Sequence, residues 1–88
     1  PNVTAKLKAG ATVARSEEGR WAFLPAARGL RLYVAGEEIE VDRSAAPLVK
    51  LLCRSRRHEA SEIAKAAKSA AARELLQRLF AKGALYFA

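Results

Sequence analysis

The chain has 88 residues, of which 51% are hydrophobic and 28% charged, and its formal net charge is +7. This length limits it to one small domain, and the hydrophobic fraction is typical of a folded protein rather than a disordered one. The single cysteine excludes an internal disulfide and favours a reducing compartment, while no apolar run approaches the roughly 20 residues of a membrane helix. We therefore expect a cytoplasmic domain with no membrane partner.

The first third of the chain predicts a short helix followed by strands. Residues 2–9 have helical spacing that Gly10 can end, and residues 11–15 predict a strand. Residues 16–19 have turn chemistry, and residues 20–24 predict a second strand whose two large aromatic residues share one face. This segment therefore predicts a sheet rather than more helix.

A β-hairpin is predicted next. Residues 25–29 break the pairing of the preceding strand because proline cannot donate to a ladder. Residues 30–34 and 37–41 then alternate apolar and polar side chains around a turn at Ala35 and Gly36. The second strand carries four acids that protect its edge against pairing with other chains, namely Glu37, Glu38, Glu40 and Asp42.

The second half predicts three helices and a closing strand. The first helix covers roughly residues 45–55 and is capped by Asp42 or Ser44; the second is capped by Glu59 or Ser61 and runs to about Lys68. Ser69 can cap the third, which runs from about 70 to 82; without this break the second and third form one long helix. Gly83 ends the helices before an aromatic strand. The predicted core is Val13, Trp21, Phe23, Leu30, Leu32, Val34, Ile39, Val41, Leu48, Leu51, Leu52, Ile63, Leu75, Leu76, Leu79, Phe80, Leu85 and Phe87, with a marginal place for Ser55.

Few residues are available for catalysis. One His and one Cys cannot build a clustered iron or zinc site, and we interpret His58 as solvated or helix-capping and Cys53 as a half-buried, inert thiol. Glu37 and Glu38 are adjacent on a strand and point to opposite faces, so they cannot act on one bond as acid and base. No glycine-rich phosphate loop is present. The sequence thus predicts no catalytic, cofactor-binding or metal-binding residue.

Basic residues of the helical half form the candidate binding site. Residues 1–42 contain six Lys or Arg and six acids, whereas residues 43–88 contain ten Lys or Arg and three acids. This asymmetry favours an acidic partner (RNA, DNA or an acidic protein surface), although a generic solvated surface is an equal alternative. The third helix begins with three alanines, which disfavours sequence-specific DNA reading relative to nonspecific RNA contact. The candidate contacts are Lys50, Arg54, Arg56, Arg57, Lys65, Lys68, Arg73 and Arg78.

Two tyrosines are further candidates for contact surfaces. Tyr33 and Tyr86 lie at outward positions of the predicted strands, where a phenol can bury its ring and keep its hydroxyl solvated. An exposed aromatic strand at the end of the chain is suited to a homodimer or an interdomain contact. The alternative is that both are ordinary sheet residues.

Three segments in fixed order carry a family resemblance, namely residues 7–15 (LKAGATVAR), 32–39 (LYVAGEEI) and 76–87 (LQRLFAKGALYF). The chain resembles the C-terminal winged-helix domain of bacterial JmjC-type (cupin-like) ribosomal oxygenases, which has a YxNGE hairpin turn and a GxxxF terminal strand. Ala35 departs from this pattern, since Asn is usual there. The resemblance implies an α+β, winged-helix-like domain over residues 1–88, which is a fragment of a larger protein.

The resemblance also implies a context for the domain. Full-length members bind Fe(II) through a His-x-Asp…His triad in a separate N-terminal barrel, use 2-oxoglutarate and hydroxylate a ribosomal protein. The leading hypothesis is therefore a noncatalytic accessory domain that packs on the N-terminal catalytic domain and, through the parent protein, engages the ribosomal protein and rRNA. The alternative is an independent small basic nucleic-acid-binding winged-helix protein.

Overall fold

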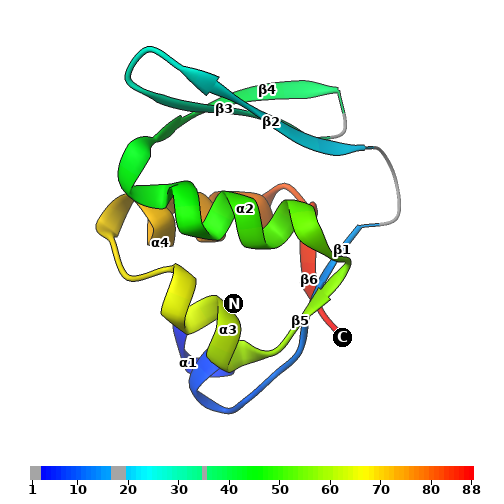
Figure 1. The fold of residues 1–88 in the computed structure, drawn as a ribbon. Helices are drawn as coiled ribbons and strands as arrows, with labels where there is room; N and C mark the ends of the chain where they lie inside the picture. The colour runs from blue at the N-terminus through cyan, green and yellow to red at the C-terminus, as the bar shows by residue number, and fades with distance from the viewer. Residues whose placement is uncertain (1–2, 17–19, 35) are drawn as a thin grey trace.

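A computed structural model describes residues 3–16, 20–34 and 36–88. Figure 1 shows a β2–β3–β4 sheet lying over helices α2 and α4, helices α1 and α3 on the far side of α2, and a small β5–β1–β6 sheet at one end. The elements are α1 (Val3–Lys8), β1 (Val13–Arg15), β2 (Trp21–Ala26), β3 (Gly29–Val34), β4 (Glu37–Asp42), the 3₁₀ turn η1 (Arg43–Ala45), α2 (Ala46–Arg54), β5 (Arg57–His58), α3 (Ala60–Ala66), α4 (Ala70–Ala81) and β6 (Leu85–Phe87).

The larger sheet contains the predicted hairpin and extends it. Strands β3 and β4 pair antiparallel, as predicted, with Leu32 opposite Ile39. The predicted break at residues 25–29 is confirmed only for the turn at residues 27–28; its bounds are wrong, because β2 continues through Pro25, which lies opposite Leu30 in the ladder with β3. Since β2 is an edge strand, a proline without an N–H is tolerated there. The predicted turn residues 17–19 and 35 lie outside the described residues.

A second sheet joins distant parts of the chain. Strand β1 lies in its middle and pairs antiparallel with β5 on one side and β6 on the other. The predicted hairpin and the predicted terminal strand therefore belong to different sheets. Strand β5 was not predicted: residues 54–58 have the composition of a basic connector, and only a two-residue pairing with β1 makes part of them a strand.

Capping residues set the helix boundaries close to where the sequence predicts them. Ser69 accepts a hydrogen bond of 3.1 Å from the Ala72 N–H, which confirms the break before α4. Glu59 is the N-cap of α3 and forms a capping box with Glu62. Gly83 follows α4 with a positive φ of 79°, a conformation that costs glycine little. No helix in the described part of the chain is long and apolar enough to cross a bilayer.

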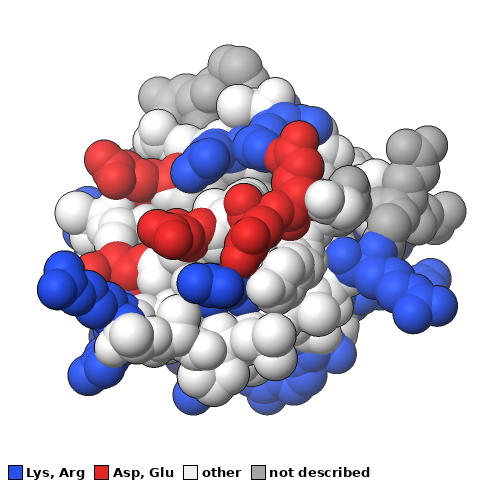
Figure 2. All heavy atoms as spheres, turned by 90° about the horizontal axis from the view of Figure 1, so that it is seen from above, with Lys and Arg blue, Asp and Glu red and all other residues white. Residues whose placement is uncertain are grey.

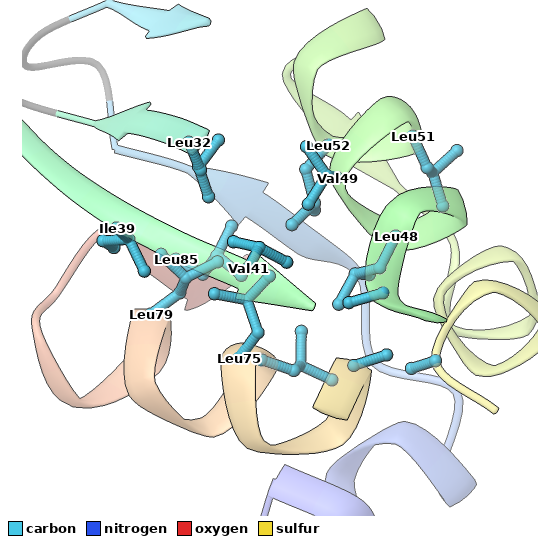
Figure 3. Close-up of a cluster of buried hydrophobic side chains, with 14 of the residues drawn as sticks. Leu32, Ile39, Val41, Leu48, Val49, Leu51, Leu52, Leu75, Leu79 and Leu85 are labelled. Carbon is cyan, nitrogen blue, oxygen red and sulfur yellow. The ribbon is translucent and has the colours of Figure 1, made fainter. Parts of the chain in front are cut away.

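The core lies between the β2–β3–β4 sheet and the helices. Figure 3 shows side chains of α2, α4 and β4 converging on one cluster, and the predicted stripes of these elements are buried there. Val49 is fully buried although the sequence pattern missed it, and Ser55 is exposed rather than inward. Four predicted core aromatics are only partly buried and pack on the rim of the cluster, namely Trp21, Phe23, Phe80 and Phe87.

Candidate interface for an acidic partner

The eight predicted contact residues are all exposed, but they do not form one surface. The fold separates them into a group at the end of α2, a group at the α3–α4 connection, and a single residue facing the β2–β3–β4 sheet. The first group is Lys50, Arg54, Arg56 and Arg57, the second is Lys65, Lys68 and Arg73, and the last is Arg78. The charge count along the chain thus overstates the size of any single basic patch.

The arginine cluster, defined as Arg54, Arg56 and Arg57, lies where α2 ends and β5 begins. Lys50 lies one helical turn before Arg54 and shares its face. The cluster lies beside the C-terminal end of α2, where the helix dipole favours positive charge. None of these side chains forms an ion pair with any described acid. Their charges are therefore available to a partner.

Arg15 adjoins this cluster, although the sequence did not predict it as a site residue. Its backbone N–H donates to the Arg56 carbonyl at 2.8 Å, and its Nη1 donates to the Leu52 carbonyl at 3.2 Å. Its guanidinium also lies over the Trp21 ring, 5.6 Å from the centroid. The sequence does not predict Arg15 as a site residue, because it lies in the charge-balanced half of the chain and contacts α2 only in the folded domain.

Cys53 lies close to this region and fits its interpretation as an inert thiol. The side chain is half-buried. Burial raises the pKa of the Cys53 thiol, and the charge of Arg15 opposes that shift only in part. The neutral thiol is therefore favoured at neutral pH, and Cys53 is not a nucleophile in this surface.

The second basic group is partly used by the fold itself. Arg73 Nη2 donates a hydrogen bond of 2.7 Å to the Lys68 carbonyl and so closes the α3–α4 connection. Arg73 also lines a mainly apolar hollow of about 210 Å³ between α1, α3 and α4, together with Leu7, Ala67 and Leu76. This group therefore has a structural role as well as a charge.

Acids of the hairpin oppose the charge on the other side of α4. Lys82 is hydrogen-bonded and ion-paired to Glu37, and this contact, with a smaller effect of Arg78, lowers the pKa of the Glu37 carboxyl. Arg78 itself shares a hollow with Glu40, Asp42 and Glu74. Helix α4 is thus bordered by carboxylates along β4, which repel phosphates.

The outer face of the larger sheet carries mixed charge. Figure 2 shows acidic side chains gathered in the middle of this face, with Lys and Arg side chains among and around them. Arg31 pairs with Glu38 at 3.4 Å, and the half-buried Tyr33 donates its hydroxyl to the same carboxylate at 3.4 Å. The Tyr33 hydroxyl therefore already has a hydrogen-bond partner within the domain. Tyr86, which is 43% exposed, is the tyrosine that remains open to a partner molecule.

The described residues contain no group of three His, Cys, Asp or Glu side chains able to hold a metal ion, so an iron site does not fit within them. His58, predicted as solvated or helix-capping, is 2% exposed and belongs to β5, with Nε2 2.9 Å from the Ser55 carbonyl. It is buried because its pairing partner is the fully buried Val13. His58 therefore fixes the turn that carries the arginine cluster.

The chain matches a known protein family. A family model described as ROXA-like winged helix matches residues 1–86, which is nearly the whole chain. No curated protein and no solved structure matches it. The match agrees with the three-helix block and the small antiparallel sheet described above.

Proposed function

The chain belongs to the ROXA-like winged-helix family, and from this premise we propose that it is a noncatalytic accessory domain of a JmjC-type ribosomal protein hydroxylase. Its role is to pack beside the catalytic domain of the same protein and to help engage the ribosomal protein substrate. The observation that carries the proposal is the family match over residues 1–86. The proposal includes that the chain is part of a longer protein.

Two features of the surface support a packing role. Among the described residues, Leu24 and Tyr86 are the large apolar side chains that remain exposed, at 56% and 43%, and Leu24 is the one that lies in the larger sheet. Strand β2 carries Leu24 at the edge of its sheet and has no charged residue between Trp21 and Ala26, whereas the opposite edge strand carries four acids. An uncharged edge with an exposed leucine is suited to cover by another domain.

Chemistry in this proposal belongs to the parent protein. Fe(II) and 2-oxoglutarate would be bound in a separate N-terminal catalytic domain, which would supply the oxidising chemistry. The described residues of this chain would contribute packing and substrate contact only, since no group of them fits a metal ion.

The test begins with the coding sequence upstream of Pro1. An in-frame cupin barrel with a His-x-Asp pair is expected. The full-length protein should hydroxylate a ribosomal protein in a mass-spectrometric assay, and a variant lacking residues 1–88 should lose substrate turnover while retaining 2-oxoglutarate binding. Equal turnover by the truncated protein would contradict a role in substrate engagement.

The second candidate function is an independent small basic nucleic-acid-binding protein. The arginine cluster favours it, because three exposed arginines that form no ion pair with a described acid are an electrostatic footprint for phosphates. Reading of a DNA groove by α4 is disfavoured by the carboxylates along β4. A start codon directly before Pro1 would select this candidate over the first.

A further inference from the structure

We propose that the outer face of the β5–β1–β6 sheet binds single-stranded nucleic acid, with the Tyr86 ring stacked on a base and the arginine cluster on phosphates. The proposal goes beyond the accessory role, because it uses the small sheet and Tyr86 rather than the β2 edge with Leu24 that is assigned to domain packing. It rests on the register of the small sheet, the exposure of Tyr86 and the unpaired charges beside it.

The register places an aromatic and a cation in one row. Ala14 of β1 lies opposite Arg57 of β5 on one side and opposite Tyr86 of β6 on the other. Neighbouring residues of these strands point to the other face, where Val13 and His58 are buried. Arg57 and Tyr86 are therefore exposed on the outer face, with a cation on one side of the buried Ala14 and a phenol on the other.

The dimensions of this row suit a nucleotide. Adjacent strands lie about 4.8 Å apart, so the backbones that carry Arg57 and Tyr86 are separated by roughly 10 Å. Ala14 lies between them with a side chain of one methyl group and is 2% exposed, while Arg57 and Tyr86 are exposed. A base stacked on the exposed Tyr86 ring thus has the Arg57 guanidinium within reach of its neighbouring phosphate.

Hydrogen bonds hold the backbone of the arginine cluster in place. The Arg56 carbonyl accepts from the Arg15 N–H at 2.8 Å, the Ser55 hydroxyl donates to the Arg57 carbonyl at 3.2 Å, and His58 Nε2 lies 2.9 Å from the Ser55 carbonyl. Figure 1 shows this turn joining the end of α2 to the edge of the sheet. The arginines consequently project from a fixed backbone, and their planar guanidinium groups match phosphate oxygens better than lysine does.

Single-stranded nucleic acid accounts for these features better than the other acidic partners. An acidic protein segment would use the arginines but gives no role to an exposed tyrosine in the same sheet. A duplex hides the faces of its bases, whereas a single strand can stack them on an aromatic side chain beside a basic groove. Helix α4 is bordered by Glu37, Glu40 and Asp42, so approach along that helix is electrostatically unfavourable.

The experiment is a titration of the 88-residue chain into a fluorescent oligouridylate of about twelve nucleotides, read by anisotropy at about 50 to 200 mM salt. Three variants test the surface: Tyr86→Ser, Tyr86→Phe and the triple variant R54A/R56A/R57A. A matched control, R28A/R31A/R43A, removes the same number of positive charges from exposed positions near the larger sheet. Circular dichroism verifies that each variant is folded.

We expect Tyr86→Ser to weaken binding by about five-fold or more, and Tyr86→Phe to leave it nearly unchanged, because a stacked base needs the ring and not the hydroxyl. The triple variant should lower the slope of log K against log salt by about 2, since each phosphate contact to a single strand contributes roughly 0.7. The matched control should change the slope by much less.

Three results would overturn the proposal. Equal losses in the triple variant and the matched control would indicate attraction to net charge alone. Equal affinities of Tyr86→Ser and Tyr86→Phe would remove the stacking contact. Tighter binding of a duplex of the same length, or of polyglutamate, would assign the surface to a different class of partner.

Discussion

Ser69 makes two hydrogen bonds that can be separated by mutation. Its hydroxyl oxygen accepts from the Ala72 N–H at 3.1 Å, which caps α4, and its hydroxyl donates to the Ser44 carbonyl at 3.1 Å, which ties the α3–α4 connection to η1. Loss of an N-cap costs about 1 kcal/mol. The Ser44 carbonyl is exposed and can bond to water, so its lost bond adds only about 0.5 kcal/mol. Ser69→Ala should therefore lower the free energy of unfolding by roughly 1.5 kcal/mol.

Urea and thermal unfolding followed by circular dichroism measure this effect. For a domain of this size, a loss of about 1.5 kcal/mol lowers Tm by roughly 6 to 12 °C. Ser69→Asp keeps an acceptor at the positive end of the α4 dipole but removes the donor to Ser44, so it should cost no more than about 0.5 kcal/mol. Ser61→Ala, at an exposed helical position, is the matched control. The reasoning fails if Ser69→Ala is as stable as Ser61→Ala, or if Asp at position 69 is as damaging as Ala.

Three other perturbations have defined outcomes. Gly29→Ala should cost about 1 to 3 kcal/mol in urea unfolding, because the new Cβ would lie 2.2 Å from the Val41 carbonyl oxygen; wild-type stability would contradict this close approach. Cys53 should react with iodoacetamide more slowly at pH 8 than the unfolded chain does, because burial raises its pKa; equal rates would refute this. The pKa of Glu37 is lowered in the folded state, so the stability that its carboxylate contributes is present above its ordinary pKa and is lost as the pH falls through the folded value. Lys82→Met should therefore reduce the difference in unfolding free energy between pH 7 and pH 3. An unchanged difference would argue against the pairing of Glu37 with Lys82.

Local signals in the sequence predicted the helical half well. Ser69 and Gly83 are boundary residues whose preference for caps and positive φ depends on the nearest turn alone, so they could be placed without knowledge of the fold. The β3–β4 hairpin was equally visible, because alternation and a turn glycine are local features. Strand β5 forms only because it pairs with β1, which is distant in sequence. Strand β2 can continue through Pro25 only because it is an edge strand with β3 on one side and no strand on the other.

The sequence predicts which basic residues belong to the candidate site, but it does not predict which of them lie together on one surface. Counting charges identified Arg54, Arg56 and Arg57, which are indeed exposed and unpaired with the described acids. The same count could not reveal that Arg78 faces carboxylates of β4 or that Arg73 is bonded to the α3–α4 connection. It also missed Arg15, whose neighbours at Leu52 and Trp21 come from other elements. Ion pairing is set by tertiary contact, which a single sequence does not record.

In this topology the surface available for binding nucleic acid lies on the small sheet rather than on α4. Carboxylates of β4 border one side of that helix, and on another side Arg73 and Leu76 line the hollow that α4 shares with α1 and α3. The small sheet, in contrast, takes its middle strand from the start of the chain and an outer strand from its end. The row Arg57–Ala14–Tyr86 is assembled from three segments far apart in sequence and exists only when that sheet is formed. A nucleic-acid contact of this domain should therefore disappear with unfolding of the small sheet, even where α4 remains helical.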